Sequence, residues 1–346
     1  LMIESDNASG WLYGGEATEI TSQHDFKVNA AYIQFEVPFN KKINLKINTR
    51  IESNRINYNG TALGYNENFD LVQINPINYS TNHNLLGGRF SFNYFLTNNS
   101  TVFSSMSWGY KAGGVNQHPY LSNNNRFFSP EYILNAEVGY RLMAEKINFN
   151  SVLFSARRFD QQVSISSQQK EGDPNSFFYY TANATSGSLN GLEIEGILHL
   201  TRTISINSDL GLLSTIVDPF TYNSGNEQST TLGGRGASHA PSYSYAMGIN
   251  YHNDSGLFFH IELIGKDQFY FSDSHNGTSN RYEIINAHIG YIKGAWSLKL
   301  WGRNIFDERY ANRGFYFGLE PPSYKDKLYV SWGDPIHYGL TLGISL

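Results

Sequence analysis

The end of the chain, residues 338–346, alternates strictly between apolar and small or polar side chains. Successive side chains of a β-strand point to opposite sides, so this pattern places all of the apolar side chains on one face. The apolar positions are Tyr338, Leu340, Leu342, Ile344 and Leu346, and the positions between them are Gly339, Thr341, Gly343 and Ser345. One such strand fits many folds, whereas a sheet that meets lipid on one side requires the pattern in nearly every strand.

The same alternation recurs along most of the chain. In residues 29–39, for example, Ile33, Phe35 and Val37 oppose Gln34 and Glu36. The pattern predicts about 14 strands and no amphipathic helix, although the alternation in residues 147–166 is less regular. The expected strands are residues 11–18, 29–39, 43–52, 86–96, 102–110, 132–142, 147–166, 192–200, 204–216, 243–251, 257–263, 285–291, 296–300 and 338–346.

The connections between these strands alternate between short turns and long polar loops. The short turns lie at Asn40, Asn98, Glu145, Arg202, Asp254 and Gly294. The long loops are residues 59–83, 113–130, 167–185, 219–241, 272–281 and 311–336. A soluble all-β repeat has no reason to keep this rhythm, whereas a transmembrane barrel does. We therefore predict an all-β fold, an antiparallel transmembrane β-barrel with short periplasmic turns and long extracellular loops.

Composition agrees with this fold and excludes several others. The 346 residues include no cysteine and carry a formal net charge of −5, which gives no reason to expect nucleic-acid binding. Mean hydropathy is −0.39, and no apolar run approaches the roughly 18 residues that a membrane helix needs. A barrel tolerates a low mean because its inner face is polar and only alternate residues meet lipid. The first ten residues, LMIESDNASG, lack the basic and apolar regions of a signal peptide and read as the interior of a longer protein.

Four motifs, in order along the chain, resemble those of the TonB-dependent outer-membrane receptors. The C-terminal one runs from Leu300 to Asp307, read as LWGRNIFD, with Tyr310 just beyond it and an aromatic rim at residues 315–317. The other three are the segments 109–116 (GYKAGGVN), 129–140 (SPE and EVGY) and 240–243 (APSY), the last preceding Gly248.

The resemblance implies a barrel of 22 strands, of which about 14 can be placed here, together with an N-terminal plug domain and a TonB box. We expect residues 1–346 to be the C-terminal portion of such a barrel domain, without plug and box. The family implies the outer membrane of a Gram-negative bacterium, lipid and lipopolysaccharide around the barrel, and the TonB energy-transducing complex as partner through the missing plug. Two features depart from the pattern: the chain ends in Leu346 rather than an aromatic residue, and Lys111-Ala112-Gly113 replaces the Arg-Ala-Pro of haem receptors.

No catalytic constellation stands out, so we expect neither an enzyme nor a cofactor. The ten histidines are scattered, and none of their spacings is typical of a zinc site. Charged side chains of the inner face are expected chiefly to pair with one another or with a plug; a polar path for the cargo is the alternative. These side chains are Lys46, Arg50, Glu52, Glu137, Arg141, Glu193, Glu195, Glu262, Lys266, Lys299 and Arg303.

Two loops concentrate side chains suited to ligand binding. The candidates are His118, Tyr120, Arg126, Phe127 and Phe128 in one loop, and Tyr179 and Tyr180, which follow Phe177 and Phe178, in another. Aromatic rings offer rigid contact area, and arginine pairs with carboxylate or catecholate oxygens. Packing between loops or contact with lipopolysaccharide would explain the same residues.

The resemblance implies TonB-dependent uptake of a scarce, bulky ligand, most often a ferric siderophore. Two alternatives remain open on the residues alone: a passive porin or adhesin built from the barrel without a plug, and a TonB-dependent receptor for cobalamin or an oligosaccharide.

Overall fold

The computed structural model describes residues 2–11, 17–65, 70–118, 121, 123–168, 177–224, 228–318 and 320–345. Its main element is one antiparallel sheet of 14 strands, each hydrogen-bonded to its neighbours in chain order. The strands are β1 (Met2–Trp11), β2 (Ala17–Asn40), β3 (Ile43–Tyr65), β4 (Leu71–Thr97), β5 (Ser100–Lys111), β8 (Glu131–Met143), β9 (Ile147–Phe159), β12 (Ser186–His199), β13 (Ile204–Val217), β16 (Tyr243–His252), β17 (Leu257–Lys266), β18 (Tyr282–Lys293), β19 (Trp296–Arg303) and β22 (His337–Ile344).

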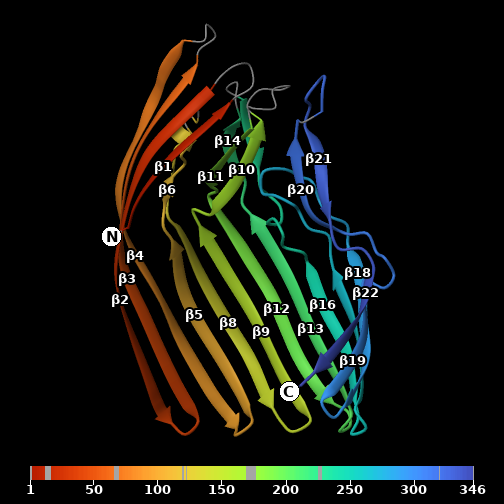
Figure 1. Cartoon of the computed structure of the whole chain (residues 1–346). Coiled ribbons are helices and arrows are strands. Elements are labelled where there is room, and N and C mark those ends of the chain that lie inside the picture. The colour runs from red at the N-terminus through yellow and green to blue at the C-terminus, as the bar shows by residue number, and fades with distance from the viewer. Residues whose placement is uncertain are drawn as a thin grey trace.

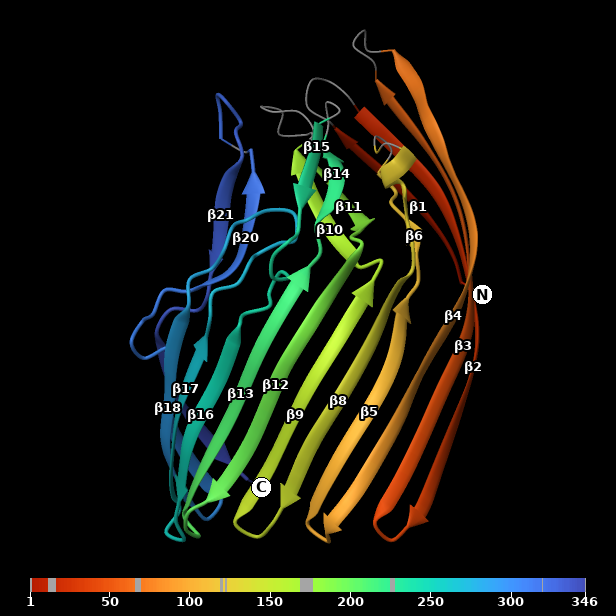
Figure 2. The ribbon, with the colours of Figure 1, turned by 180° about the vertical axis from the view of Figure 1, so that it is seen from behind.

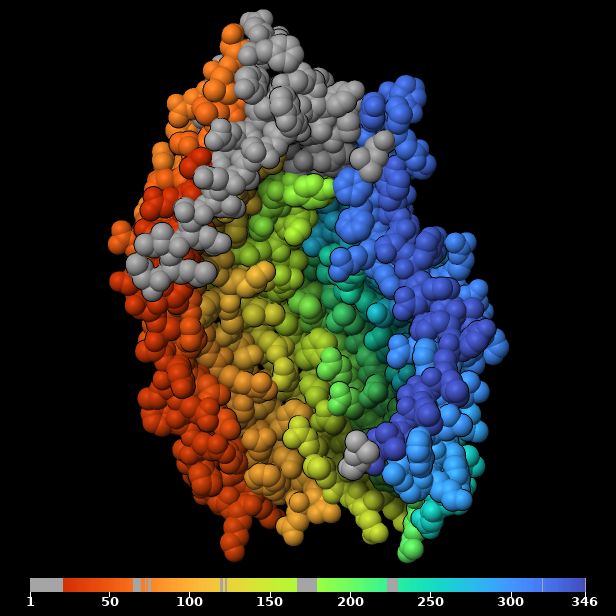
Figure 3. All heavy atoms as spheres, in the orientation of Figure 1, coloured from red at the N-terminus to blue at the C-terminus, as the bar shows by residue number. Residues whose placement is uncertain are grey.

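The sheet curves into a trough whose strands are tilted, with tight turns at one end and long connections at the other (Figures 1 and 2). We call these the turn end and the loop end. The space-filling view looks into the hollow between the β2–β4 flank and the β18–β22 flank (Figure 3). Because every connection in the sheet is antiparallel and sequential, the fold confirms the predicted all-β, barrel-type architecture. Within the described ranges, no helix is long and apolar enough to cross a membrane.

The two faces of the sheet differ as the alternation predicts. On the outer face, Phe35, Val138 and Leu342 are 55%, 47% and 66% exposed, because nothing in the protein itself covers them. On the inner face, charged side chains pair with one another: Arg89 of β4 reaches across β5 and lies 3.0 Å from Glu137 of β8. Further inner-face pairs are Lys46–Glu36 and Arg50–Glu52. The inner face is therefore a hydrated, cross-linked wall, and the outer face is an apolar band suited to lipid.

Four small pairs of strands lie beyond the main sheet at the loop end. They are β6 (Gly114–Val115) with β7 (Phe127–Phe128), β10 (Gln162–Gln168) with β11 (Phe177–Asn183), β14 (Phe220–Ser224) with β15 (Gln228–Leu232), and β20 (Ala311–Phe317) with β21 (Lys327–Trp332). A short 3-10 helix, η1 (Asn123–Asn125), lies between β6 and β7. Within the described residues, four of the six predicted long loops therefore contain short paired strands.

Three expectations about strand boundaries are wrong. Residues 59–83 are not mainly loop: β3 continues to Tyr65 and β4 begins at Leu71, with Ser80 Oγ donating to Asn57 Oδ1 over 2.7 Å. A strand that presents no apolar face to lipid needs no apolar alternation, so this stretch carries no alternating strand pattern. The strand expected at 11–18 is instead the end of β1 and the start of β2, and residues 12–16 lie outside the described ranges. The long strand expected at 147–166 is divided into β9 and β10 near Asp160, whose φ is +50°.

Candidate functional site

A first buried cluster joins three of the outer segments at the loop end. Its members come from the 113–130 loop, from β10 and β11, and from the β13–β15 region; we call it the first loop core. They are Leu121, Val163, Ile165, Tyr180, Ala184, Val217, Phe220 and Tyr222. Because apolar burial is the main source of stability in such small units, this packing holds the hairpins in fixed positions above the sheet.

A second buried cluster lies under the last outer hairpin. Phe269 and Phe271 pack against Ala311 at the start of β20, and Leu328 and Val330 of β21 cover them. The rings of Phe269 and Phe271 meet edge to face, with centroids 5.8 Å apart. We call this the second loop core, and it connects the 267–281 loop to the β20–β21 hairpin.

A cleft of about 420 Å³ opens between the two cores. We call it the loop-end cleft. Its lining residues are Asn116, Ser164, Ile165, Ser166, Tyr179, Tyr180, Thr181, Phe271, Ser272, His275, Phe315 and Tyr316. None of these residues carries a carboxylate, ammonium or guanidinium group, so the cleft offers aromatic surface with hydroxyl, amide and imidazole groups.

Asn116 fixes the first wall of the cleft. Its Nδ2 donates to the carbonyls of Asn125 and Thr181 over 2.7 and 2.8 Å, and its Oδ1 accepts from Thr181 N over 2.9 Å. This side chain therefore ties β11 to the 113–130 loop. Successive residues of β11 point to opposite sides, so Tyr180 is 5% exposed in the first loop core while Tyr179 is 55% exposed. Burial, with Tyr222 as a second cause, raises the pKa of the Tyr180 hydroxyl well above its ordinary value.

Arg235 fixes the opposite wall. Its guanidinium lies 4.0 Å from the ring centroid of Tyr270, and its Nη2 donates to the carbonyls of Ser272 and His275 over 2.9 and 2.8 Å. His275 in turn packs edge to face on Tyr316, with centroids 4.8 Å apart. Burial, followed by the positive charge of Arg235, lowers the pKa of the His275 imidazole, so this ring is neutral near pH 7.

The structure brings only part of the predicted site into the cleft. Tyr179 and Tyr180 line it, whereas Arg126 is 8% exposed and donates from Nε to Leu121 O over 3.1 Å. Phe127 stacks on Tyr79, with centroids 4.7 Å apart and planes at 17°. Three predicted residues remain. The ring of Phe128 covers Gly114, and burial lowers the pKa of His118. Tyr120 lies outside the described residues.

Sequence reasoning missed the second wall of the cleft. Phe271, His275, Phe315 and Tyr316 come from the 267–281 loop and from β20, far along the chain from Tyr179. The aromatic rim at 315–317 was visible in the sequence, but nothing there indicated which other loop it would face.

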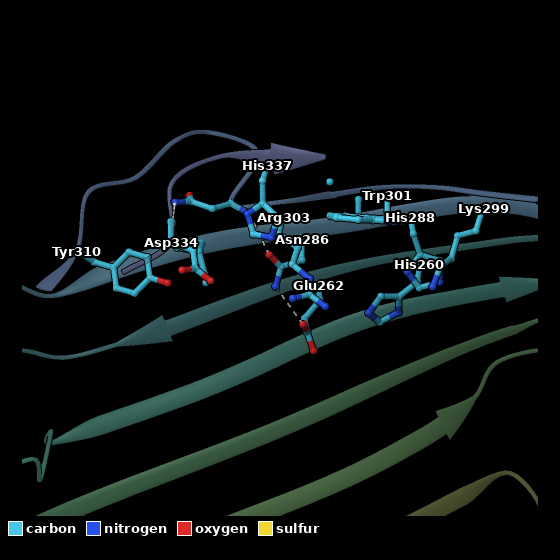
Figure 4. Close-up of a pocket in the computed structure, with 14 residues that line it drawn as sticks. His260, Glu262, Asn286, His288, Lys299, Trp301, Arg303, Tyr310, Asp334 and His337 are labelled. Carbon is cyan, nitrogen blue, oxygen red and sulfur yellow. Dashed lines mark hydrogen bonds between the residues drawn. The ribbon is translucent and has the colours of Figure 1, made fainter. Parts of the chain in front are cut away.

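A second cavity, of about 630 Å³, lies on the inner face of β17, β18 and β19 (Figure 4). It is lined by His260, Glu262, Ile284, Asn286, Ala287, His288, Lys299, Trp301, Gly302, Arg303, Asn304, Tyr310, Asp334 and His337. The lining holds two carboxylates and two basic side chains, so its formal charges cancel when the histidines are neutral.

The C-terminal motif forms one end of this second cavity. Asn304 is 3% exposed and has a φ of +45°, a conformation that asparagine tolerates better than most residues. Its Oδ1 accepts from Glu308 N over 2.9 Å, and its Nδ2 donates to the Asp334 carbonyl over 3.0 Å. Asp307 Oδ1 accepts from Ile336 N over 2.9 Å. The Asn and Asp of the motif therefore fasten the chain that leads into β22.

The fold and the two cavities define an outer-membrane-type barrel wall with a structured, aromatic loop end. A family model described as "TonB dependent receptor-like, beta-barrel" matches residues 4–305, which is most of the chain. The chain belongs to the TonB-dependent receptor family.

Solved structures support the same fold. The ferric yersiniabactin uptake receptor FyuA from Yersinia pestis matches with a TM-score of 0.77 and 16% identity, over 99% of this chain and 49% of that one. The siderophore receptor PiuA from Acinetobacter baumannii matches with a TM-score of 0.68 and 14% identity, over 95% of this chain and 44% of that one. The copper transporter OprC matches with a TM-score of 0.68 and 11% identity, over 96% of this chain and 54% of that one. The chain thus spans about half the length of these proteins, which are receptors and a transporter rather than enzymes.

Proposed function

We propose that residues 1–346 are the C-terminal part of the barrel of an outer-membrane receptor that takes up a ferric siderophore in a TonB-dependent way. The receptors FyuA and PiuA, which share the fold, support siderophore-type cargo. In this proposal the apolar outer face contacts outer-membrane lipid and lipopolysaccharide, and a plug domain supplies the contact with the TonB complex.

The observation that carries the proposal is the loop-end cleft. Its two walls are rigid because Asn116 and Arg235 hold them through hydrogen bonds to main-chain groups. Between these walls, Tyr179 and Phe315 remain 55% and 44% exposed. Exposed aromatic rings on a fixed frame bind at a low entropic cost, since little side-chain freedom is lost. The cleft therefore suits a bulky, aromatic chelate that stacks on these rings.

The test is ligand binding by cells that carry the natural protein. Tyr179→Ala combined with Tyr316→Ala removes one ring from each wall and should weaken binding about tenfold, or ~1.4 kcal/mol. Tyr329→Ala is the matched control, because this residue lies opposite Phe315 in the same hairpin but does not line the cleft.

A panel of labelled ferric chelates, cobalamin and oligosaccharides identifies the ligand class. Saturable binding of a ferric chelate that the double variant loses and the control keeps supports the proposal. Binding of cobalamin or an oligosaccharide alone would replace the siderophore by that ligand. Wild-type affinity in the double variant would remove the cleft from the site.

A further inference from the structure

Two histidines of the second cavity face each other across neighbouring strands. His260 of β17 is paired in register with His288 of β18, and both are half-buried on the inner face. Their ring centroids lie 5.1 Å apart, with planes at 31°, and Figure 4 shows the two imidazoles side by side. The uptake function proposed above gives this pair no role.

The separation of the rings matches the requirement of a shared metal ion. Metal–nitrogen bonds to imidazole are about 2.0–2.1 Å, so two rings that subtend an angle near 100° at one ion have centroids about 5 Å apart. The observed distance of 5.1 Å between the two ring centroids meets this condition.

A hydrogen-bonded chain orients the first of the two rings. His260 Nδ1 donates to Asn250 Oδ1 over 2.7 Å, and Asn250 Nδ2 donates to Asn207 Oδ1 over 3.0 Å. With the proton on Nδ1, the Nε2 lone pair of His260 is free to bind a ligand. An oxygen acceptor behind the distal nitrogen is the arrangement that metal-binding histidines use to fix their tautomer.

Gly248 leaves space for the hydrogen bonds that join His260, Asn250 and Asn207. A Cβ at this position would lie 2.6 Å from Asn207 Oδ1 and 3.0 Å from His260 Cε1. Only glycine at this position therefore leaves space for the Asn207 amide and the His260 imidazole where they lie. Three neighbouring strands, β13, β16 and β17, thus cooperate to hold a single ring.

We propose that His260 and His288 form an open two-histidine site for a divalent transition-metal ion, with Cu²⁺ bound most tightly and water completing the coordination. Imidazole nitrogen suits this class of ion, and affinities in the series peak at Cu²⁺. Across the described ranges, no group of three or more His, Asp or Glu side chains is arranged to hold a metal, so the pair acts with solvent. Because Glu262 and Asp334 offset Lys299 and Arg303 in the lining, net charge does not exclude a cation. This site is independent of which chelate the loop-end cleft binds.

Copper titration of the natural protein without an affinity tag, purified in detergent, tests the site. Electron paramagnetic resonance should show one Cu²⁺ with two nitrogen ligands. His260→Ala or His288→Ala should reduce the affinity at least tenfold. His199→Ala, a change of a solitary histidine near the turn end of β12, should leave it unchanged.

Variants of Asn250 test whether the two histidines form an oriented metal site or are neighbours without a binding role. As a positioning residue it should matter through His260, so Asn250→Ala should weaken Cu²⁺ about tenfold, since loss of an outer-shell partner costs about 10–100-fold. Asn250→Asp retains an oxygen acceptor for Nδ1 and should restore binding. Wild-type affinity in the His260→Ala/His288→Ala variant, or a spectrum without paired nitrogen ligands, would overturn the proposal. Equal loss in both Asn250 variants would overturn the role of the hydrogen-bonded chain.

Discussion

Asn304 and Asp334 are joined by a 3.0 Å hydrogen bond from the Asn304 side-chain amide to the Asp334 carbonyl. The bond links the end of β19 to the segment that enters β22, across the whole β20–β21 hairpin. The same buried amide also holds Glu308 through its main-chain nitrogen and carbonyl. One side chain thus fastens the segment that leads into the last strand.

Asn304→Ala should therefore destabilise the C-terminal part of the sheet. The change removes three hydrogen bonds to main-chain groups of Glu308 and Asp334, each worth about 0.5–1.5 kcal/mol net. It also places alanine at a positive φ. Urea unfolding of the purified protein measures the effect, with Asn280→Ala as an exposed control. Equal midpoints for the two variants would show that the hydrogen bonds contribute nothing net.

A cationic side chain introduced on the outer face of the sheet should destabilise the fold, and one introduced on the inner face should not. Val138→Arg places a charge near the middle of β8 and should lower the free energy of unfolding by about 2–4 kcal/mol, whereas Leu198→Arg, beside the turn end of β12, should cost less. Asn135→Arg and His199→Arg place the same charge on the inner face and should be tolerated. Folding into lipid vesicles measures both pairs, and equal sensitivity of the two faces would contradict the assignment.

Acidification should loosen the loop-end cleft. Burial lowers the pKa of His275 and of His118 below the unfolded value of about 6.5. Below that value the unfolded segment binds more protons than the folded one, so folded stability decreases as the pH falls. The protection factors of the amides in the 267–281 loop, which correct for the slower intrinsic hydrogen exchange at low pH, should therefore be lower at pH 5 than at pH 7.5. His275→Gln should reduce this pH dependence for that loop; an unchanged dependence would assign it to other groups.

The strands were largely predictable, and the cleft was not. Alternation such as that of Ile33, Phe35 and Val37 is imposed by lipid on one side and water on the other, so it is visible in the sequence. The outer part of β3 and β4 is rich in Asn and Ser and buries Ile56, Tyr58 and Ile77 within the protein, so its strands left no such lipid-facing pattern. The cleft brings Tyr179 and Tyr316 together through curvature of the whole sheet and packing of two separate loop cores, neither of which has a local sequence signal.

The sequence-based assignment of Arg126 and Phe127 to the ligand stays a prediction that mutation can test. In the structure, Arg126 Nε donates to Leu121 O, so the pair also stabilises its own loop. Arg126→Ala with Phe127→Ala should weaken ligand binding about tenfold, or ~1.4 kcal/mol. If the pair acts by holding the loop, proteolysis within residues 113–130 should accelerate in parallel. Weaker binding with unchanged proteolysis would indicate direct contact with the ligand, and unchanged binding would exclude both roles.

Energised uptake is the central claim, and transport in paired strains tests it most directly. Cells that carry the natural protein are given a labelled ferric chelate that they bind, in the presence and absence of TonB. We predict that surface binding is equal in both strains and that accumulation requires TonB. Accumulation at the same rate without TonB would contradict the account and indicate a passive channel.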